Sequence, residues 1–115
     1  MNILLLDDNH EIRHIIETFF KYCVPNSIIF PCGTLNEAIS LLHIKAIDIA
    51  ILDYELPDGH SIEILPLFPV SCIKIGVSGQ SLDSEILKLF DFFFKKPFNL
   101  HQLIPCMIDK ICLTA

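Results

Sequence analysis

Five polar side chains that could take part in chemistry follow short apolar runs of this sequence. Asp7 and Asp8 come directly after the run NILLL, and Asp53 comes after IAIL. Ser78 follows CIKIGV, and Lys96 follows DFFFK. Carboxylates that gather in one place repel one another unless a cation bridges them, and hard oxygen ligands suit Mg²⁺. If the fold brings these residues together, the acids are candidate ligands of a divalent metal ion.

The apolar runs themselves predict five strands. Each run is short, is bounded by turn-forming residues and is apolar almost throughout. This pattern is typical of strands that are buried on both faces of a parallel sheet. The predicted strands span residues 2–6, 27–31, 48–53, 72–77 and 91–95.

Five helices are predicted to alternate with these strands. Asn9 can cap the first helix, and the sequence from Thr34 to Glu37 has the form of a capping box at the start of the second. Pro66 ends the third helix early, and Pro105 kinks the last helix or delays its start. The predicted helices span about residues 10–23, 35–44, 61–65, 82–90 and 99–113.

Strands that alternate with helices predict right-handed β-α-β units and one parallel sheet, which is an α/β fold. The carboxyl ends of parallel strands lie at one edge of the sheet, where ligands bind in open α/β folds. The acids after the first and third strands, the hydroxyl after the fourth and the lysine after the fifth should therefore share that edge. A chain with only a structural core has no need for such a set there.

The composition indicates one domain over residues 1–115, with 52% hydrophobic residues and enough length to bury a core. No apolar run approaches the roughly 20 residues of a membrane span, and the short run after Asn2 does not make a signal peptide. We therefore expect a cytoplasmic chain without a membrane partner. The net charge of −6 does not favour direct binding of nucleic acid, which usually requires a basic surface.

Neither the cysteines nor the histidines form a recognisable metal or redox motif. The five cysteines lack CxxC spacing, which argues against zinc binding and thiol redox chemistry, and most of them are expected to be small core residues. Only His10 among the five histidines lies near the acids in sequence, and we expect it to be an exposed bystander.

Taken together, four motifs of this chain resemble the receiver domain of two-component response regulators (CheY-like family). They are Asp7-Asp8 after the first strand, Asp53 in LDYELPDG, Ser78 in VSG and Lys96 in KKPF. The resemblance covers essentially the whole chain and implies a doubly wound, flavodoxin-like sheet with strand order 2-1-3-4-5. The spacings from Asp53 to Ser78 and from Ser78 to Lys96 are each short by roughly one helical turn, which predicts short third and fourth helices.

The resemblance also implies an acceptor and a metal site. Asp53 would be the residue that is phosphorylated, and it would contribute to the binding of Mg²⁺. Asp8 would bind the metal directly, and Asp7 would help through a water molecule or as a ligand. The backbone carbonyl of Glu55 would be a further ligand. The protein would take part in phosphoryl transfer, including its own phosphorylation and dephosphorylation, without being a dedicated enzyme.

Two further roles are implied at the ends of the fourth and fifth strands. Ser78 and Lys96 would hold oxygens of the phosphoryl group. Ser78 and the aromatic residue Phe93 would form a conformational switch that reports phosphorylation. Phe93 lacks the phenol oxygen of a tyrosine, so its inward and outward states would differ only in packing. Glu55 and Gln80 occupy positions that influence the lifetime of the phosphoryl group in this family.

The sequence therefore predicts a phosphoacceptor receiver domain. Its donor would be a histidine kinase or a histidine phosphotransfer protein, and its output would be a downstream protein partner or a self-dimer. The main alternative is a pseudo-receiver, an interaction module that works without phosphorylation. An aspartate-nucleophile phosphatase would need a second acid two residues after Asp53, where Glu55 stands, but the chain lacks room for a substrate cap. A flavodoxin-like electron carrier would need a phosphate-binding first loop rich in hydroxyl residues and glycine, whereas this loop is Asp7-Asp8-Asn9.

Overall fold

A computed structural model describes residues 1–96, 105 and 109 of the chain. Five parallel strands form one sheet in the order β2-β1-β3-β6-β7. Counted along the chain, this is the predicted order 2-1-3-4-5, and the predicted doubly wound α/β fold is confirmed. The strands are β1 (Asn2–Leu6), β2 (Ile28–Cys32), β3 (Ile49–Asp53), β6 (Ile73–Ser78) and β7 (Phe92–Lys95).

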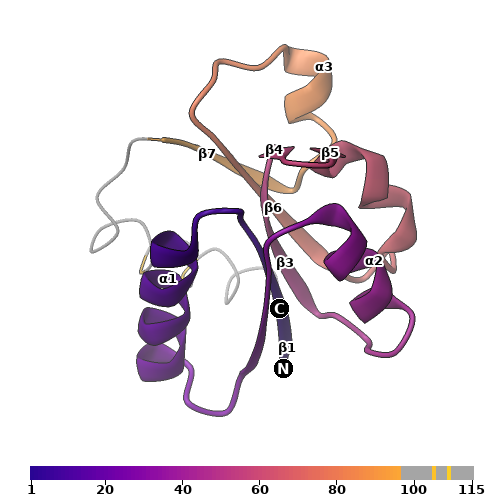
Figure 1. Ribbon diagram of the computed structural model, residues 1–115. Coiled ribbons are helices and arrows are strands. Elements are labelled where there is room, and N and C mark those ends of the chain that lie inside the picture. The colour runs from indigo at the N-terminus through magenta and orange to yellow at the C-terminus, as the bar shows by residue number, and fades with distance from the viewer. Residues whose placement is uncertain (97–104, 106–108, 110–115) are drawn as a thin grey trace.

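Helices cover both faces of this sheet, as Figure 1 shows. Helix α1 (His10–Cys23) packs on one face, where Ile16 and Phe20 meet the buried side chains of Ile3 and Leu5. Helix α2 (Leu35–Leu42) and the 3-10 helix η1 (Ser61–Leu67) cover the opposite face. Because successive side chains of a strand point to opposite faces, β1 supplies both core clusters and is apolar from Ile3 to Leu6.

The predicted caps of the first two helices are present. The Asn9 side chain accepts a hydrogen bond from the backbone N–H of Ile12, and the Thr34 hydroxyl accepts one from the N–H of Glu37. These bonds satisfy donors that have no partner within a helix, which fixes where each helix begins. They also fix the loops that precede the helices, and the loop before α1 carries Asp7 and Asp8.

The third and fourth helices are short, as predicted, but their bounds differ from the prediction. Helix η1 continues through Pro66 to Leu67, because the N–H of Phe68 donates to the carbonyl of Leu65 and this 3-10 bond does not need the missing N–H of Pro66. The predicted helix over residues 82–90 is wrong in length. Helix α3 spans only Ser84–Leu87, because residues 88–90 close into turns before β7 begins.

A small hairpin was not predicted at all. Strands β4 (Glu55–Leu56) and β5 (Gly59–His60) pair antiparallel directly after Asp53. Gly59 has a φ of 144°, and a Cβ atom there would lie 2.6 Å from the Glu63 carboxylate. A glycine is therefore required at this turn, since other residues rarely adopt that backbone conformation.

The remaining expectations about the chain fall partly outside the described residues. The predicted last helix, apart from Pro105 and Asp109, lies outside them, and so do Cys106 and Cys112. Cys32 and Cys72 are buried, and burial raises the pKa of each thiol to about 11. Cys23 is exposed, so it is an exception to the expectation that most cysteines lie in the core. Within the part of the chain that the structure describes, none of the helices has the length and apolar character needed to cross a bilayer.

Gly76 in β6 gives a prediction about packing near the candidate switch. A Cβ atom at this position would lie 2.7 Å from the Phe93 ring and 2.9 Å from the Phe90 ring. Gly76→Ala should therefore lower the free energy of unfolding by about 1–3 kcal/mol, the usual cost of overpacking a core. Chemical denaturation measures this value. Gly79→Ala is the control, because the nearest atom to its Cβ lies 4.0 Å away. Equal stability of Gly76→Ala and the wild type would contradict the prediction.

Candidate functional site

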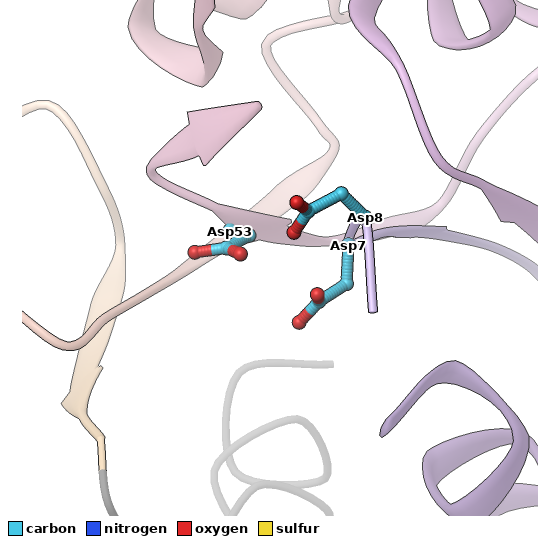
Figure 2. A group of neighbouring side chains, drawn as sticks. All are labelled: Asp7, Asp8 and Asp53. Atoms are coloured by element: carbon cyan, nitrogen blue, oxygen red, sulfur yellow. The ribbon is translucent and has the colours of Figure 1, made fainter. Parts of the chain in front are cut away.

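Three carboxylates meet at the carboxyl edge of the sheet. Asp7 and Asp8 follow β1, and Asp53 is the last residue of the neighbouring strand β3. One carboxylate oxygen from each residue lies within 4.8 Å of those of the other two. Figure 2 shows the three side chains, with Asp8 reaching toward Asp53. Asp7 and Asp53 are buried, while Asp8 is exposed.

Asp7 is held in place by several bonds to its surroundings. Its N–H donates to the carbonyl of Cys32, which extends the pairing of β1 with β2 by one residue. Its carboxylate accepts a hydrogen bond of 2.9 Å from the N–H of Asn9. Its carbonyl accepts a bond of 2.7 Å from the guanidinium of Arg13. The side chain is therefore pre-oriented by the same loop that begins α1.

Lys96 joins the acids from the other side. Its ammonium donates to a carboxylate oxygen of Asp7 at 3.1 Å and to one of Asp53 at 3.2 Å. Its backbone N–H donates to the carbonyl of Ser78, which positions it after β7. Burial alone would lower the pKa of Lys96, but the charges of Asp53 and Asp7 outweigh it and raise that pKa. Lys96 is therefore a cation at physiological pH.

The carboxyl group of Asp53 is strongly perturbed. Burial raises its pKa from 3.8 to about 6, the nearby charge of Asp7 adds to the rise, and Lys96 opposes it. A buried carboxylate next to a like charge is unstable without a cation, which is why Lys96 lies between the two acids. At neutral pH Asp53 is mainly ionised and can act as a nucleophile.

Ser78 ends β6 beside this cluster, where its side chain is only 2% exposed. Its hydroxyl accepts a hydrogen bond of 3.0 Å from the N–H of Gln80. Asp53, Ser78 and Lys96 line one cavity of about 380 Å³. Its other walls come from the loop of Asp8, the β4–β5 hairpin and the loop after β6. The cavity is large enough for a small anionic group.

Sequence comparison supports the resemblance, although no family model matches the chain. A protein called stress response regulator protein 1, from Debaryomyces hansenii, is 29% identical over 96% of this chain and 50% of its own length. The regulatory protein VanR from Enterococcus faecium is 31% identical over 89% of this chain and 46% of its own length. The chain thus spans about half the length of the curated relatives it matches.

Structure comparison decides the fold. A response regulator receiver domain from Methanospirillum hungatei superimposes with a TM-score of 0.82 at 24% identity, over 98% of this chain and 94% of that one. The chain has the fold of a response regulator receiver domain. A response regulator from Burkholderia pseudomallei also matches, with a TM-score of 0.74 and 14% identity over 97% of this chain and 73% of that one. That structure contains a phosphorylated aspartic acid, a calcium ion and citrate.

The acidic cluster of this receiver fold suits a divalent metal ion. Three carboxylates within 4.8 Å of one another supply hard oxygen ligands, and the single ammonium of Lys96 does not balance all three negative charges. Asp7, Asp8 and Asp53 could therefore hold such an ion. The predicted backbone ligand, Glu55, follows Asp53 by two residues and lines the same cavity.

Removal of one carboxylate gives a test of this metal site. Asp8→Ala should weaken the binding of Mg²⁺ at least about tenfold, which corresponds to about 1.4 kcal/mol. Asp8 is the exposed acid of the cluster, so its loss leaves the buried pair with Lys96 in place. Titration calorimetry with Mg²⁺ measures the affinity. Glu11→Ala, an exposed acid in the first turn of α1, is the control. Wild-type affinity in Asp8→Ala would refute the ligand role.

The structure places the two predicted switch residues on neighbouring strands. Ser78 lies opposite Lys95 in the register of β6 with β7, and Phe93 lies opposite Gly76. Phe93 is half-buried and contacts the ring of Phe90 with centroids 5.8 Å apart. Phe92 and Phe94 pack on the opposite face of the sheet, against the α1 cluster. Phe93 is thus the aromatic residue of β7 that shares a face with α3.

Sequence reasoning missed two groups of contacts around the site. The Gln80 amide donates to the Glu55 carboxylate across the mouth of the cavity, and it joins the loop after β6 to the hairpin. The Asp58 carboxylate accepts hydrogen bonds from the first two N–H groups of α2, at 2.8 Å from Leu35 and 3.0 Å from Asn36. These bonds lower the pKa of Asp58. In the sequence, the turn residues Pro57-Asp58-Gly59 were the only sign of these contacts, and they indicate a turn without indicating its partner. His10 is exposed at the start of α1, as expected.

Proposed function

We propose that this chain is a phosphoacceptor receiver domain and that Asp53 receives the phosphoryl group. The observation that supports the proposal is the position of Asp53: a buried carboxylate, 3.2 Å from the Lys96 ammonium, beside two further acids and a cavity. The proposed donor is a phosphohistidine of a histidine kinase or phosphotransfer protein, and the reaction would take place in the cytoplasm.

The proposed transfer uses few protein groups. A carboxylate oxygen of Asp53 forms a bond to phosphorus while the bond from phosphorus to the donor imidazole nitrogen breaks. The imidazole keeps the electron pair and takes up a proton from water. Lys96 would donate hydrogen bonds to the phosphoryl oxygens, and the Ser78 hydroxyl lines the same cavity. A Mg²⁺ ion bound at Asp7, Asp8 and Asp53 would supply positive charge that offsets the negative charge of the transferred group.

The test is intact mass after incubation with acetyl phosphate and Mg²⁺. We expect the mass to rise by one phosphoryl group in the presence of Mg²⁺ and to stay unchanged when the metal is removed with a chelator. In this probe the bond that breaks is the one between phosphorus and the acetate oxygen. A mass that stays constant under both conditions would overturn the proposal and favour the pseudo-receiver alternative.

A pseudo-receiver is the less favoured function because the acid, hydroxyl and lysine set is complete and gathered in one place. The phosphatase alternative needs a free second acid near Asp53. The Glu55 side chain is exposed and accepts a hydrogen bond from Gln80 instead. We therefore keep phosphorylation of Asp53 as the proposed function.

We also propose that phosphorylation is reported through Ser78, Phe93 and the short helix α3. The Ser78 hydroxyl can hydrogen-bond a phosphoryl group, and its inward movement would leave space for the Phe93 ring. Helix α3 is a single turn with no buried residue, so few contacts hold it in one position.

Hydrogen exchange with and without beryllofluoride, a mimic of the phosphoryl group, tests this switch. We expect exchange protection to change over residues 78–96, because these residues include Ser78, α3 and Phe93, and to stay nearly constant in α2. Changes confined to the loops of Asp7, Asp8 and Asp53 would mean that the chain binds the anion without switching.

A further inference from the structure

A second concave surface lies between the edge strand β2 and helix α2. It has a volume of about 430 Å³, and its apolar walls come from Phe30, Cys32, Leu41 and Ile44. Ile44 is 74% exposed and adds an apolar side chain to this surface. The groove shares no lining residue with the cavity at Asp53. The proposed phosphoacceptor function therefore leaves this groove unexplained.

The edge of β2 is poorly suited to a strand from another protein. The backbone N–H of Ile28 donates to the carbonyl of Met1, and the carbonyl of Cys32 accepts from the N–H of Asp7. The backbone groups of the even-numbered residues of β2 therefore point toward β1. The backbone N–H and carbonyl groups at the free edge of the sheet are then those of Ile29 and Pro31. Proline has no N–H to donate, so an added strand would lose a ladder bond at Pro31, the penultimate residue of β2. A helix face therefore fits this groove better than an added strand does.

Opposite charges lie at the two ends of α2. Glu37 lies in its first turn and lines the groove. Lys45 lies three residues beyond Leu42, the last residue of α2, in a turn where its backbone N–H donates to the carbonyl of Leu41 at 2.9 Å. The Lys45 ammonium is 6.0 Å from the centre of the Phe30 ring. Glu37 accepts a hydrogen bond from the Thr34 hydroxyl, which leaves its charge in place. Leu41 lies midway between the two charges in sequence. Glu37 precedes Leu41 by four helical residues, and the bond from the Lys45 N–H to the Leu41 carbonyl closes one further turn, so the backbone of each charged residue is about one helical turn, roughly 6 Å, from Leu41.

This arrangement is complementary to itself. If two copies meet through α2 in antiparallel orientation with Leu41 at the crossing, Glu37 of each copy faces Lys45 of the other. The apolar side chains of Leu41 and Ile44 are then covered on both sides. A two-fold axis then produces two identical Glu37–Lys45 pairs, because the same surface of each copy forms the contact. We propose that the β2–α2 groove is the interface of a homodimer, independent of phosphorylation at Asp53.

The interface should be weak, because α2 has only two turns. Sedimentation velocity from about 10 µM to about 1 mM should show the average sedimentation coefficient rising with concentration. Ile44→Asp places a charge in the groove and should weaken association at least about tenfold. Val70→Asp is the matched control, because Val70 is fully exposed and does not line the groove. Circular dichroism verifies that both variants are folded.

A charge exchange identifies the contact. Glu37→Lys alone and Lys45→Glu alone should each be monomeric, because each would bring like charges together in its own dimer. A mixture of the two variants should form a heterodimer, because both pairs are then opposite in charge. A monomeric wild type at all concentrations would overturn the proposal and leave the groove to a different protein. A dimer that survives Ile44→Asp, or a mixture that stays monomeric, would also overturn it.

Discussion

Asp53→Asn is expected to abolish the gain of one phosphoryl group from acetyl phosphate and Mg²⁺. An amide oxygen is a poor nucleophile, whereas the substitution keeps the size and shape of the side chain. Asp7, Asp8 and Lys96 keep their positions, because Lys96 still pairs with Asp7 at 3.1 Å. Intact mass measures the loss directly. Labelling of Asp53→Asn at the wild-type level would place the acceptor elsewhere.

The fold of this variant should not be weakened. The folded-state pKa of Asp53 is about 6, above the ordinary aspartate value of 3.8, so the stability that this group contributes is present at low pH and is lost as the pH rises through that interval. At pH 7 the ionised side chain is therefore unfavourable in the fold without metal. Asp53→Asn should have an equal or higher thermal midpoint, which excludes unfolding as the reason for lost labelling. Asp83→Asn, at an exposed position without a side-chain cap bond, should label normally.

The strands could be predicted from the sequence because a sheet buried on both faces leaves a simple signal. Each of the five apolar runs became a strand with bounds within one residue of the prediction. The bounds of η1 and α3, the helices within the shortened spacings, were harder to predict. Whether residues 88–90 continue α3 depends on where β7 begins, and the N–H of Asp91 already pairs with Lys74 of β6. That long-range bond has no local signal in the sequence.

The candidate site shows the same division. The sequence predicts that Asp7, Asp8 and Asp53 lie at one sheet edge, because the carboxyl ends of parallel strands share an edge. It does not predict that Lys96 bonds both buried acids at once, or that Gln80 reaches Glu55. These contacts depend on loop conformations that few residues determine. The hairpin after Asp53 is one example, since it depends on the positive φ of Gly59.

Lys96→Ala is expected to slow phosphorylation on the order of 10²-fold, the usual cost of removing a charged or hydrogen-bonding donor from a site where negative charge develops. The variant also leaves Asp7 and Asp53 without the cation that lies between them. Like charges that lose their shared cation attract metal more strongly, so Mg²⁺ affinity should rise or stay constant while the transfer rate falls. The initial rate of mass gain and a Mg²⁺ titration separate these two effects.

Lys95 provides the matched control within the same sequence. Its ammonium donates to the Ser81 hydroxyl at 2.9 Å, away from the acids, and its side chain is exposed. Lys95→Ala removes the same charge from the chain as Lys96→Ala but leaves the pairs with Asp7 and Asp53 intact. It should therefore label at the wild-type rate. Equal slowing in both variants would mean that only the net charge near the cavity matters. In that case, the contacts of Lys96 with the two buried acids would not be the reason for its effect.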